Sequence, residues 1–221
     1  MRIGVLGTGV VGSTIASKLV ERGHEVMMGS RTRDNDKAVA WCRKAGDRAA
    51  QGAFEDAASF GEVLFNCTGG TVSIAALEQA GAEAMGNKIL LDLANPLAFV
   101  PGELPTLTVH NTDSVGEQIQ RAFPRLRVVK TLNTMNTMIM VNPRAVPGDH
   151  NVFVSGNDAD AKAQVAGWLD EWFGWKRESI IDLGDITSAR GVEMVLPLWL
   201  RLMVTFKTPM FNFHVVRAPA S

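Results

Sequence analysis

Near its N-terminus the chain carries glycines whose spacing is typical of a phosphate-binding turn. The run is Gly7-Thr8-Gly9-Val10-Val11-Gly12, which matches G-x-G-x-x-G. It directly follows an apolar, strand-like segment and opens a helical pattern, and this context makes the motif informative. Gly7 would permit a tight turn, Gly9 would let a pyrophosphate approach the backbone, and Gly12 would let the helix pack closely on the strand. The free amides at the helix start would then bind the phosphates of a dinucleotide.

The residues after the second predicted strand indicate which dinucleotide is bound. About 20 residues beyond the motif, NAD-binding proteins carry Asp or Glu for the ribose hydroxyls. This chain has Gly29-Ser30-Arg31-Thr32-Arg33 there, and the first carboxylate is Asp34. Two guanidinium groups and two hydroxyl groups favour a 2′-phosphate, because arginine offers phosphate oxygens a planar fork of donors. We therefore predict NADP(H), bound by Ser30, Arg31 and Arg33; the alternative is that both arginines are solvated loop charges.

Three further loops follow predicted strands and carry residues suited to ligand contact. They are Thr68-Gly69-Gly70, Asn95-Pro96 and Asn133-Thr134-Met135-Asn136. Open α/β sheets bind ligands at the carboxyl ends of their strands. We expect the first loop on the adenosine or pyrophosphate side, and the other two beside the nicotinamide, where amide and hydroxyl side chains could hold its carboxamide. Each loop could instead be a structural turn, since Asn, Gly and Pro are common in turns.

Side chains for acid–base or metal chemistry do not gather in the sequence. The four histidines are scattered along the chain: His24, His110, His150 and His214. We find no Ser-His-Asp, paired-carboxylate or metal-ligand pattern. The two cysteines, Cys42 and Cys67, lack C-x-x-C spacing and are expected to be reduced, packed thiols. The sequence thus predicts a cofactor site without a catalytic acid, base or metal.

Alternating strands and helices position these loops. Strand patterns at 3–6, 25–28, 62–66, 88–93 and 127–132 alternate with helical patterns at 12–22, 72–80 and 115–123. The Ala-rich range 41–59 is interpreted as a helix, a short strand and a second helix. Strands separated by helices of this length imply βαβ units and a parallel sheet with helices on both faces. The predicted fold class is α/β, a Rossmann-type doubly wound parallel sheet with a small, mainly helical C-terminal region.

The pattern changes beyond about residue 141. We expect an NADP-binding domain over 1–140 and a C-terminal region over 141–221 that completes the substrate cleft. That region reads as a strand at 152–155, a helix at 159–173, a strand at 180–183 and a helix at 186–207. The last helix is apolar nearly all round, and such a helix must be buried on every side. This predicts a homodimer interface or a pocket wall, with Pro197 kinking the helix or joining two shorter ones.

Composition and chain start limit the possible partners and compartment. The 221 residues are 46% hydrophobic and 20% charged with a net charge of −1, which is ordinary for a soluble globular protein. A clustered basic face is missing, so a nucleic-acid partner is not expected. The strand pattern near residue 2 leaves no room for a signal peptide. The most apolar stretch, 192–206, contains three helix-interrupting or charged residues and is too short to span a bilayer. We expect a cytoplasmic protein without a membrane partner.

With these residues in view, the chain resembles the NADPH:coenzyme F420 oxidoreductase family nearly end to end. The resemblance rests on 2–9 (RIGVLGTG), 29–31 (GSR), 128–134 (VVKTLNT), 152–158 (VFVSGND) and 196–198 (LPL). Many Rossmann proteins share the first two segments, whereas the third and the C-terminal ones are more specific. The chain is also similar to the cytosolic NADPH domain of membrane ferric reductases in the same superfamily.

The resemblance implies direct hydride transfer between the nicotinamide and a deazaflavin ring stacked upon it. Such transfer needs alignment and exclusion of water more than a side-chain acid or base. By position, Thr8, Ser30, Arg31 and Arg33 would hold the phosphates of NADP. Asn133 and Thr134 stand where archaeal members have a His-Thr pair, and Asn133 is therefore a departure that bears on the second substrate. Two alternatives remain open: an NADPH-dependent flavin or ferric-chelate reductase, and a non-catalytic NADP(H)-binding regulator.

Overall fold

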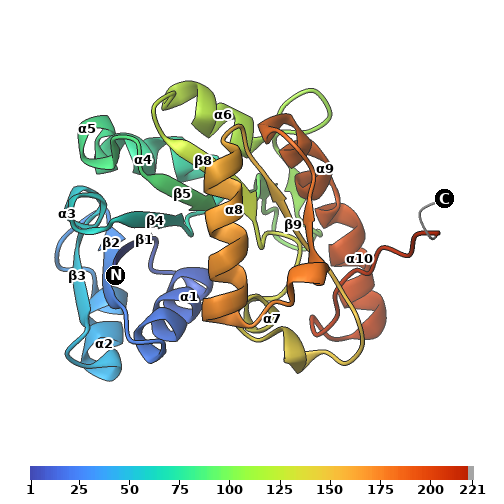
Figure 1. Cartoon of the computed structure of the whole chain (residues 1–221), viewed down its shortest axis with the longest axis horizontal. Coiled ribbons are helices and arrows are strands. Elements are labelled where there is room, and N and C mark those ends of the chain that lie inside the picture. The colour runs from blue at the N-terminus through green and yellow to red at the C-terminus, as the bar shows by residue number, and fades with distance from the viewer. Residues whose placement is uncertain (219–221) are drawn as a thin grey trace.

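An eight-stranded sheet forms the centre of the structure, a computed structural model that describes residues 1–218 (Figure 1). The strands are β1 (Arg2–Leu6), β2 (Glu25–Ser30), β3 (Ala49–Ala53), β4 (Val63–Asn66), β5 (Ile89–Asp92), β8 (Arg127–Thr131), β9 (Val152–Ser155) and β10 (Ile180–Asp182). Their order is β10-β9-β8-β5-β4-β1-β2-β3. The six strands from β3 to β8 pair in parallel. This is the strand order of dinucleotide-binding folds, and it confirms the predicted fold class.

Helices cover both faces of the sheet. They are α1 (Val10–Glu21), α2 (Asp36–Ala45), α3 (Phe54–Phe60), α4 (Ser73–Ala80), α5 (Ala82–Met85), α6 (Val115–Ala122), α7 (Thr137–Val141), α8 (Ala159–Trp168), α9 (Ala189–Met194) and α10 (Leu196–Phe206). In Figure 1, α8 crosses the front of the sheet, and α9 and α10 lie together beside β9. The range 41–59 contains the end of one helix, then a strand and a second helix, in the order that the sequence predicts.

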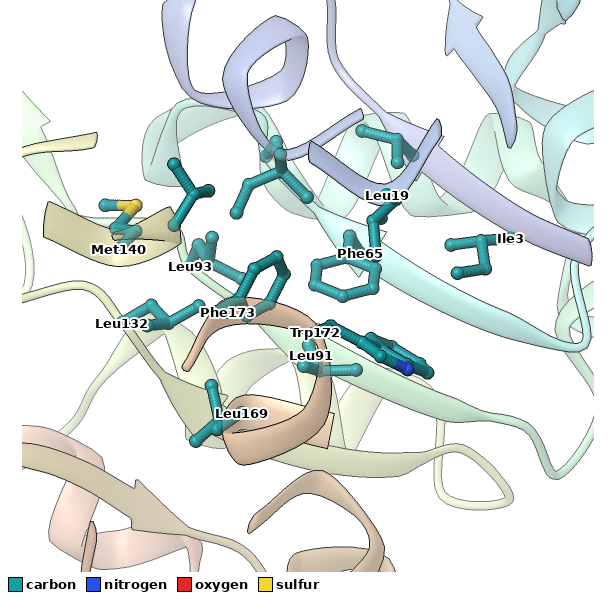
Figure 2. Packing of buried hydrophobic residues seen from close by; sticks show 14 of the residues in the cluster. Ile3, Leu19, Phe65, Leu91, Leu93, Leu132, Met140, Leu169, Trp172 and Phe173 are labelled. Carbon is teal, nitrogen blue, oxygen red and sulfur yellow. The ribbon is translucent and has the colours of Figure 1, made fainter. Parts of the chain in front are cut away.

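Alternation along the central strands divides the core into two clusters. On β4, Phe65 faces the cluster formed with α1, α2, α7 and α8, whereas Leu64 faces the cluster formed with α3, α4, α5 and α6. Every residue of β4 and β5 is buried, as is typical of central parallel strands. Figure 2 shows the first cluster, in which Phe65 and Leu91 lie among Trp172, Phe173 and Leu19.

Residues beyond 141 extend the same sheet and add the last two helices. β9 pairs antiparallel with β8, and β10 pairs parallel with β9. The helix expected over 186–207 is a short 3₁₀ turn followed by α9 and α10, with Pro197 in the first turn of α10, where its missing N–H costs nothing. The expectation that this segment is buried in a homodimer interface or a pocket wall stays a prediction. α10 packs chiefly against α9, and Leu198, Val204 and Phe206 are each more than half exposed in the single chain.

Candidate functional site

The glycine turn between β1 and α1 contains two structural glycines and one that faces open space. Gly7 has a φ of 119°, and a Cβ there would lie 2.7 Å from the carbonyl oxygen of Cys67. A Cβ on Gly12 would collide with the carbonyl oxygen of Gly7. A Cβ on Gly9 would meet nothing within 4 Å. The fold therefore requires Gly7 and Gly12, and space at Gly9 is left for an approaching ligand.

The start of α1 is suited to an anion. Gly9 is its N-cap and supplies no side-chain hydrogen bond, and the first turn contains no acidic residue. Backbone amides and the positive end of the helix dipole therefore face outward beside exposed Val10 and half-exposed Thr8. Val11 is half-buried and packs against the core below the turn. The predicted phosphate-binding residues thus form one surface at the carboxyl end of β1.

The two arginines after β2 differ in a way that the sequence does not show. Arg33 makes a bidentate ion pair with Asp56, with Nε–Oδ2 and Nη2–Oδ1 distances of 2.7 Å. The hydrogen bond from Arg33, followed by one from the backbone of Ala53, lowers the pKa of the Asp56 carboxyl to about 2. Arg31 is exposed and makes no ion pair within residues 1–218. Buried Ser30 donates its hydroxyl to the carbonyl of Thr32. Of the two arginines, Arg31 is thus the one available to a ligand.

The loop after β4 is tied to the end of β5. Asn66 accepts hydrogen bonds from the Thr68 hydroxyl at 2.7 Å and donates to Asp92 at 2.8 Å. Gly70 donates its amide to the carbonyl of Asn95 at 3.0 Å, and a Cβ on Gly70 would collide with that carbonyl. Gly69 remains exposed. The predicted residues Thr68 and Gly69 therefore lie on a loop that is held firmly at the same edge of the sheet.

Asn95 and Asn133 come together at the ends of β5 and β8 and bind each other. Asn133 donates from Nδ2 to Asn95 Oδ1 and to the carbonyl of Val192, both at 2.9 Å, and Asn95 donates from its Nδ2 to the carbonyl of Asn133 at 2.9 Å. Pro96 and Thr134 are buried beside them. Leu132, which precedes Asn133, has a φ of 61°, a left-handed conformation that costs roughly 1–2 kcal/mol. The side-chain donors of this amide pair are therefore fixed by internal bonds.

A buried charged cluster below the amide pair escaped the sequence analysis. Lys130 donates from Nζ to Asp92 Oδ2 at 2.9 Å, lies 2.8 Å from Glu193 Oε1, and donates to the carbonyl of Ala94. All three ionisable side chains are at most 1% exposed. Burial lowers the pKa of Lys130, but attraction and hydrogen bonds from Asp92 and Glu193 outweigh it and hold that pKa above its ordinary value. Lysine and aspartate inside the apolar segments of β8 and β5 were the signal that could have revealed this cluster.

One cavity opens at the glycine turn, and another lies beside the hairpin that follows β5. The larger, about 870 Å³, begins at Thr8, Gly9 and Val10 and continues between α1, α2 and α7. The other, about 440 Å³, lies between residues 104–110 and α10, and Pro197 and Leu200 line it.

Within residues 1–218 no group of three or more His, Cys, Asp or Glu side chains is arranged to hold a metal ion. In the same part of the chain, no helix is both long and apolar enough to cross a membrane.

The strand order and the open glycine turn define the class as a Rossmann-type dinucleotide-binding protein. Residues 2–96 match the family model described as NADP oxidoreductase, coenzyme F420-dependent. The chain is 50% identical to a candidate F420-dependent NADP reductase from Arthrobacter sp. FB24, with a TM-score of 0.90 over 98% of this chain and 100% of that one. This protein belongs to the family of coenzyme F420-dependent NADP oxidoreductases.

More distant proteins are also similar to this chain. The metalloreductase STEAP3 of Rattus norvegicus is 29% identical over 94% of this chain, which spans only 38% of the length of that relative. A reductive aminase from Aspergillus terreus, solved with NADPH, is 20% identical with a TM-score of 0.67, over 93% of this chain and 63% of that one. At this level of identity the likeness to the aminase shows the common fold.

Proposed function

We propose that this protein transfers a hydride directly between NADPH and a deazaflavin-like acceptor of the coenzyme F420 type. The observation that carries the proposal is the Asn95–Asn133 pair. Asn133 donates to the side-chain oxygen of Asn95 and to the carbonyl of Val192, and Asn95 donates to the backbone carbonyl of Asn133. Groups fixed in this way serve to align a ring and not to move a proton. The nicotinamide supplies the hydride chemistry when bound, so the protein needs to contribute alignment and exclusion of water.

We base the proposed placement of the cofactor on the open phosphate turn. The glycine turn from Gly7 to Gly12 would bind the pyrophosphate through the amides of α1, and Arg31 would bind the 2′-phosphate. Ser30 would join Arg31 once its hydroxyl turns away from the carbonyl of Thr32, to which it donates. Arg33 would act mainly by orienting the loop, because Asp56 already binds its guanidinium. The adenosine would lie toward Thr68 and Gly69. Pro96, Thr134 and the amide pair would then lie beside the nicotinamide.

The acceptor site is proposed between the hairpin after β5 and the C-terminal helices. β6 (Leu97–Ala98) directly follows Asn95-Pro96 and pairs with β7 (Thr106–Leu107). The hairpin presents Phe99, which is 76% exposed, and the cavity of about 440 Å³ separates its second strand from α10. A planar aromatic ring that enters beside Asn133 would find apolar surface there. The family's acceptor supports this choice, and the 50% identical Arthrobacter protein strengthens it.

We further propose that the protein is a homodimer that buries the exposed side of α10, and that it is cytoplasmic. We also propose that the chain has two regions, residues 1–140 and residues 141–221. Burying apolar surface in such an interface stabilises it by about 25 cal/mol per Å². The exposed side chains that would be buried are Leu198, Val204 and Phe206. Light scattering should give a dimer for the wild type and a monomer for Leu198→Glu. The single chain already exposes Leu198, so this variant should fold. A wild-type monomer at high concentration would refute the dimer.

An anaerobic assay tests the reaction. NADPH deuterated at the transferred position is mixed with the protein and, in turn, with a deazaflavin, a free flavin and a ferric chelate. We expect oxidation of NADPH with the deazaflavin, and the label on the ring carbon of that acceptor. Turnover with the free flavin or the chelate alone would favour the second candidate, a flavin or ferric-chelate reductase like the metalloreductase relative. Tight NADPH binding without turnover on any acceptor would refute the enzyme and favour a regulator.

A further inference from the structure

The proposed function assigns no role to the buried cluster of Asp92, Lys130 and Glu193. The ammonium group of Lys130 has one acceptor for each of its three protons: Asp92, Glu193 and the carbonyl of Ala94. A fully satisfied ammonium between two carboxylates stays protonated, in agreement with the raised pKa of Lys130. Both oxygens of Asp92 accept, Oδ1 from Asn66 and the amide of Ala94 and Oδ2 from Lys130, and both oxygens of Glu193 face donors in the same way. Carboxyl groups that accept at every oxygen carry no proton, so the cluster contains two negative charges and one positive charge, with a net charge of −1.

Neighbouring groups reduce this charge but do not cancel it. Glu193 accepts hydrogen bonds from the amides of Val115 at 2.9 Å and Gly116 at 3.2 Å, at the start of α6. The N-terminal end of a helix carries a partial charge of roughly +0.5, which opposes only part of the excess. Two other acidic side chains lie near the start of α6, and both are paired: Glu117 with Arg190 at 2.8 Å and Asp113 with Arg121 at 2.8 Å. Cys67 is uncharged, because burial and then the nearby Asp92 raise the pKa of its thiol.

The cluster lies directly beneath the proposed nicotinamide end. Lys130 binds the carbonyl of Ala94, the residue before Asn95. Glu193 follows Val192, whose carbonyl accepts the hydrogen bond from Asn133. Both members of the amide pair are thus attached to residues adjacent to the cluster. Water does not reach the three charged side chains, so mobile ions cannot screen their field efficiently.

We infer that Asp92, Lys130 and Glu193 together bias a bound nicotinamide toward its oxidised form. The inference rests on the proposed function, which places the nicotinamide beside Asn95 and Asn133. When NADPH gives up a hydride, two electrons leave the ring with one proton, and the ring gains a positive charge. The phosphates and riboses are unchanged, so a buried negative charge beneath the ring stabilises the oxidised form selectively. Bound NADPH therefore becomes a stronger hydride donor. The cluster acts as a set of positioning residues and touches no reacting atom.

The ratio of two dissociation constants tests this inference without any acceptor. We would measure the Kd of NADP⁺ and of NADPH, by titration calorimetry under anaerobic conditions, for the wild type, Glu193→Gln and Glu117→Gln. Removal of the Glu193 charge should raise Kd(NADP⁺)/Kd(NADPH) by about threefold or more. The control Glu117→Gln removes a buried carboxylate from the same helix junction, but one outside the cluster that is paired with the partly exposed Arg190, and should leave the ratio unchanged. A folded Glu193→Gln protein in which both constants rise by the same factor would overturn the inference.

Two further measurements keep the inference testable if Glu193→Gln does not fold. Asp92→Asn removes the same charge from the other carboxylate and should move the ratio in the same direction. In the wild type, added salt should weaken the binding of both forms through the 2′-phosphate, while the ratio stays constant because the discriminating charge is buried. A ratio that changes with salt as strongly as the individual constants do would overturn the inference. A wild-type chain that binds neither form would instead refute the proposed function.

Discussion

The two ends of the proposed cofactor edge are built on opposite principles. At the phosphate end, Gly9 faces open space, α1 starts without a side-chain cap, and Arg31 is exposed without an ion pair within residues 1–218. At the nicotinamide end, Asn133 is 3% exposed, and its side-chain amide donates both of its protons to neighbouring groups. Unpaired groups bind a ligand by gaining new bonds, whereas paired groups hold a shape that already exists. Substitutions at the first end should therefore change affinity, and those at the second should change rate and stability.

Gly9→Val should have the largest effect. A branched side chain would occupy the place of the pyrophosphate, so NADPH binding should be lost, while the open surroundings of Gly9 leave the fold intact. Titration calorimetry and a thermal melt check the two parts. The matched control is Gly12→Val, which should unfold the protein because its Cβ collides with the carbonyl of Gly7. Normal NADPH binding by folded Gly9→Val would remove this turn from the site.

Arg31→Asp should come next. We expect NADPH to bind more weakly by about 1.5–3 kcal/mol, the range of a hydrogen bond to a charged group, and NADH to bind nearly unchanged. Arg33→Ala is the comparison, and its effect on NADPH should be smaller because Asp56 already binds Arg33. Calorimetry with both cofactors measures the difference. Equal losses for NADPH and NADH in Arg31→Asp would mean that Arg31 does not contact the 2′-phosphate.

Asn133→Ala tests the nicotinamide end. It leaves Asn95 Oδ1 and the carbonyl of Val192 without their donor, which should cost about 1–3 kcal/mol of folding stability. The hydride-transfer rate should fall more than the NADPH affinity, since the ring loses alignment and keeps its phosphate contacts. Single-turnover kinetics and a Kd measurement separate the two quantities. If the affinity fell as much as the rate, the division between the two ends would be wrong.

The smallest expected effect concerns acid stability at the phosphate end. The folded protein lowers the pKa of Asp56 from 3.8 to about 2, chiefly through its hydrogen bond with Arg33. A lowered pKa stabilises the fold above the unfolded value, and that contribution is lost as the pH falls through 3.8 toward 2. Arg33 is exposed to solvent, so the contribution is small. Melting temperatures between pH 5 and about 2 should fall less steeply for Asp56→Asn than for the wild type. Identical slopes would show that the ion pair contributes nothing measurable.

The sequence by itself determined the features that depend on neighbours along the chain. The spacing of Gly7, Gly9 and Gly12 predicts the phosphate turn, because a tight turn and a close helix need glycine at fixed steps. Short apolar runs separated by helices predict the parallel sheet, and Pro197 predicts the division of the last helical segment. These signals are local, so no knowledge of which strands pair is needed to recognise them.

Only the tertiary structure decided which polar groups satisfy one another. Asp56 lies 23 residues beyond Arg33, and Asn133 lies 38 beyond Asn95. The charged cluster joins positions 92, 130 and 193, which come from two strands and a helix. The exposure of Leu198 likewise depends on what lies beside α10. The order of strands in the sheet determines which side chains meet. A buried charge without an opposite charge or a hydrogen bond costs free energy, so the paired residues can be far apart in the sequence.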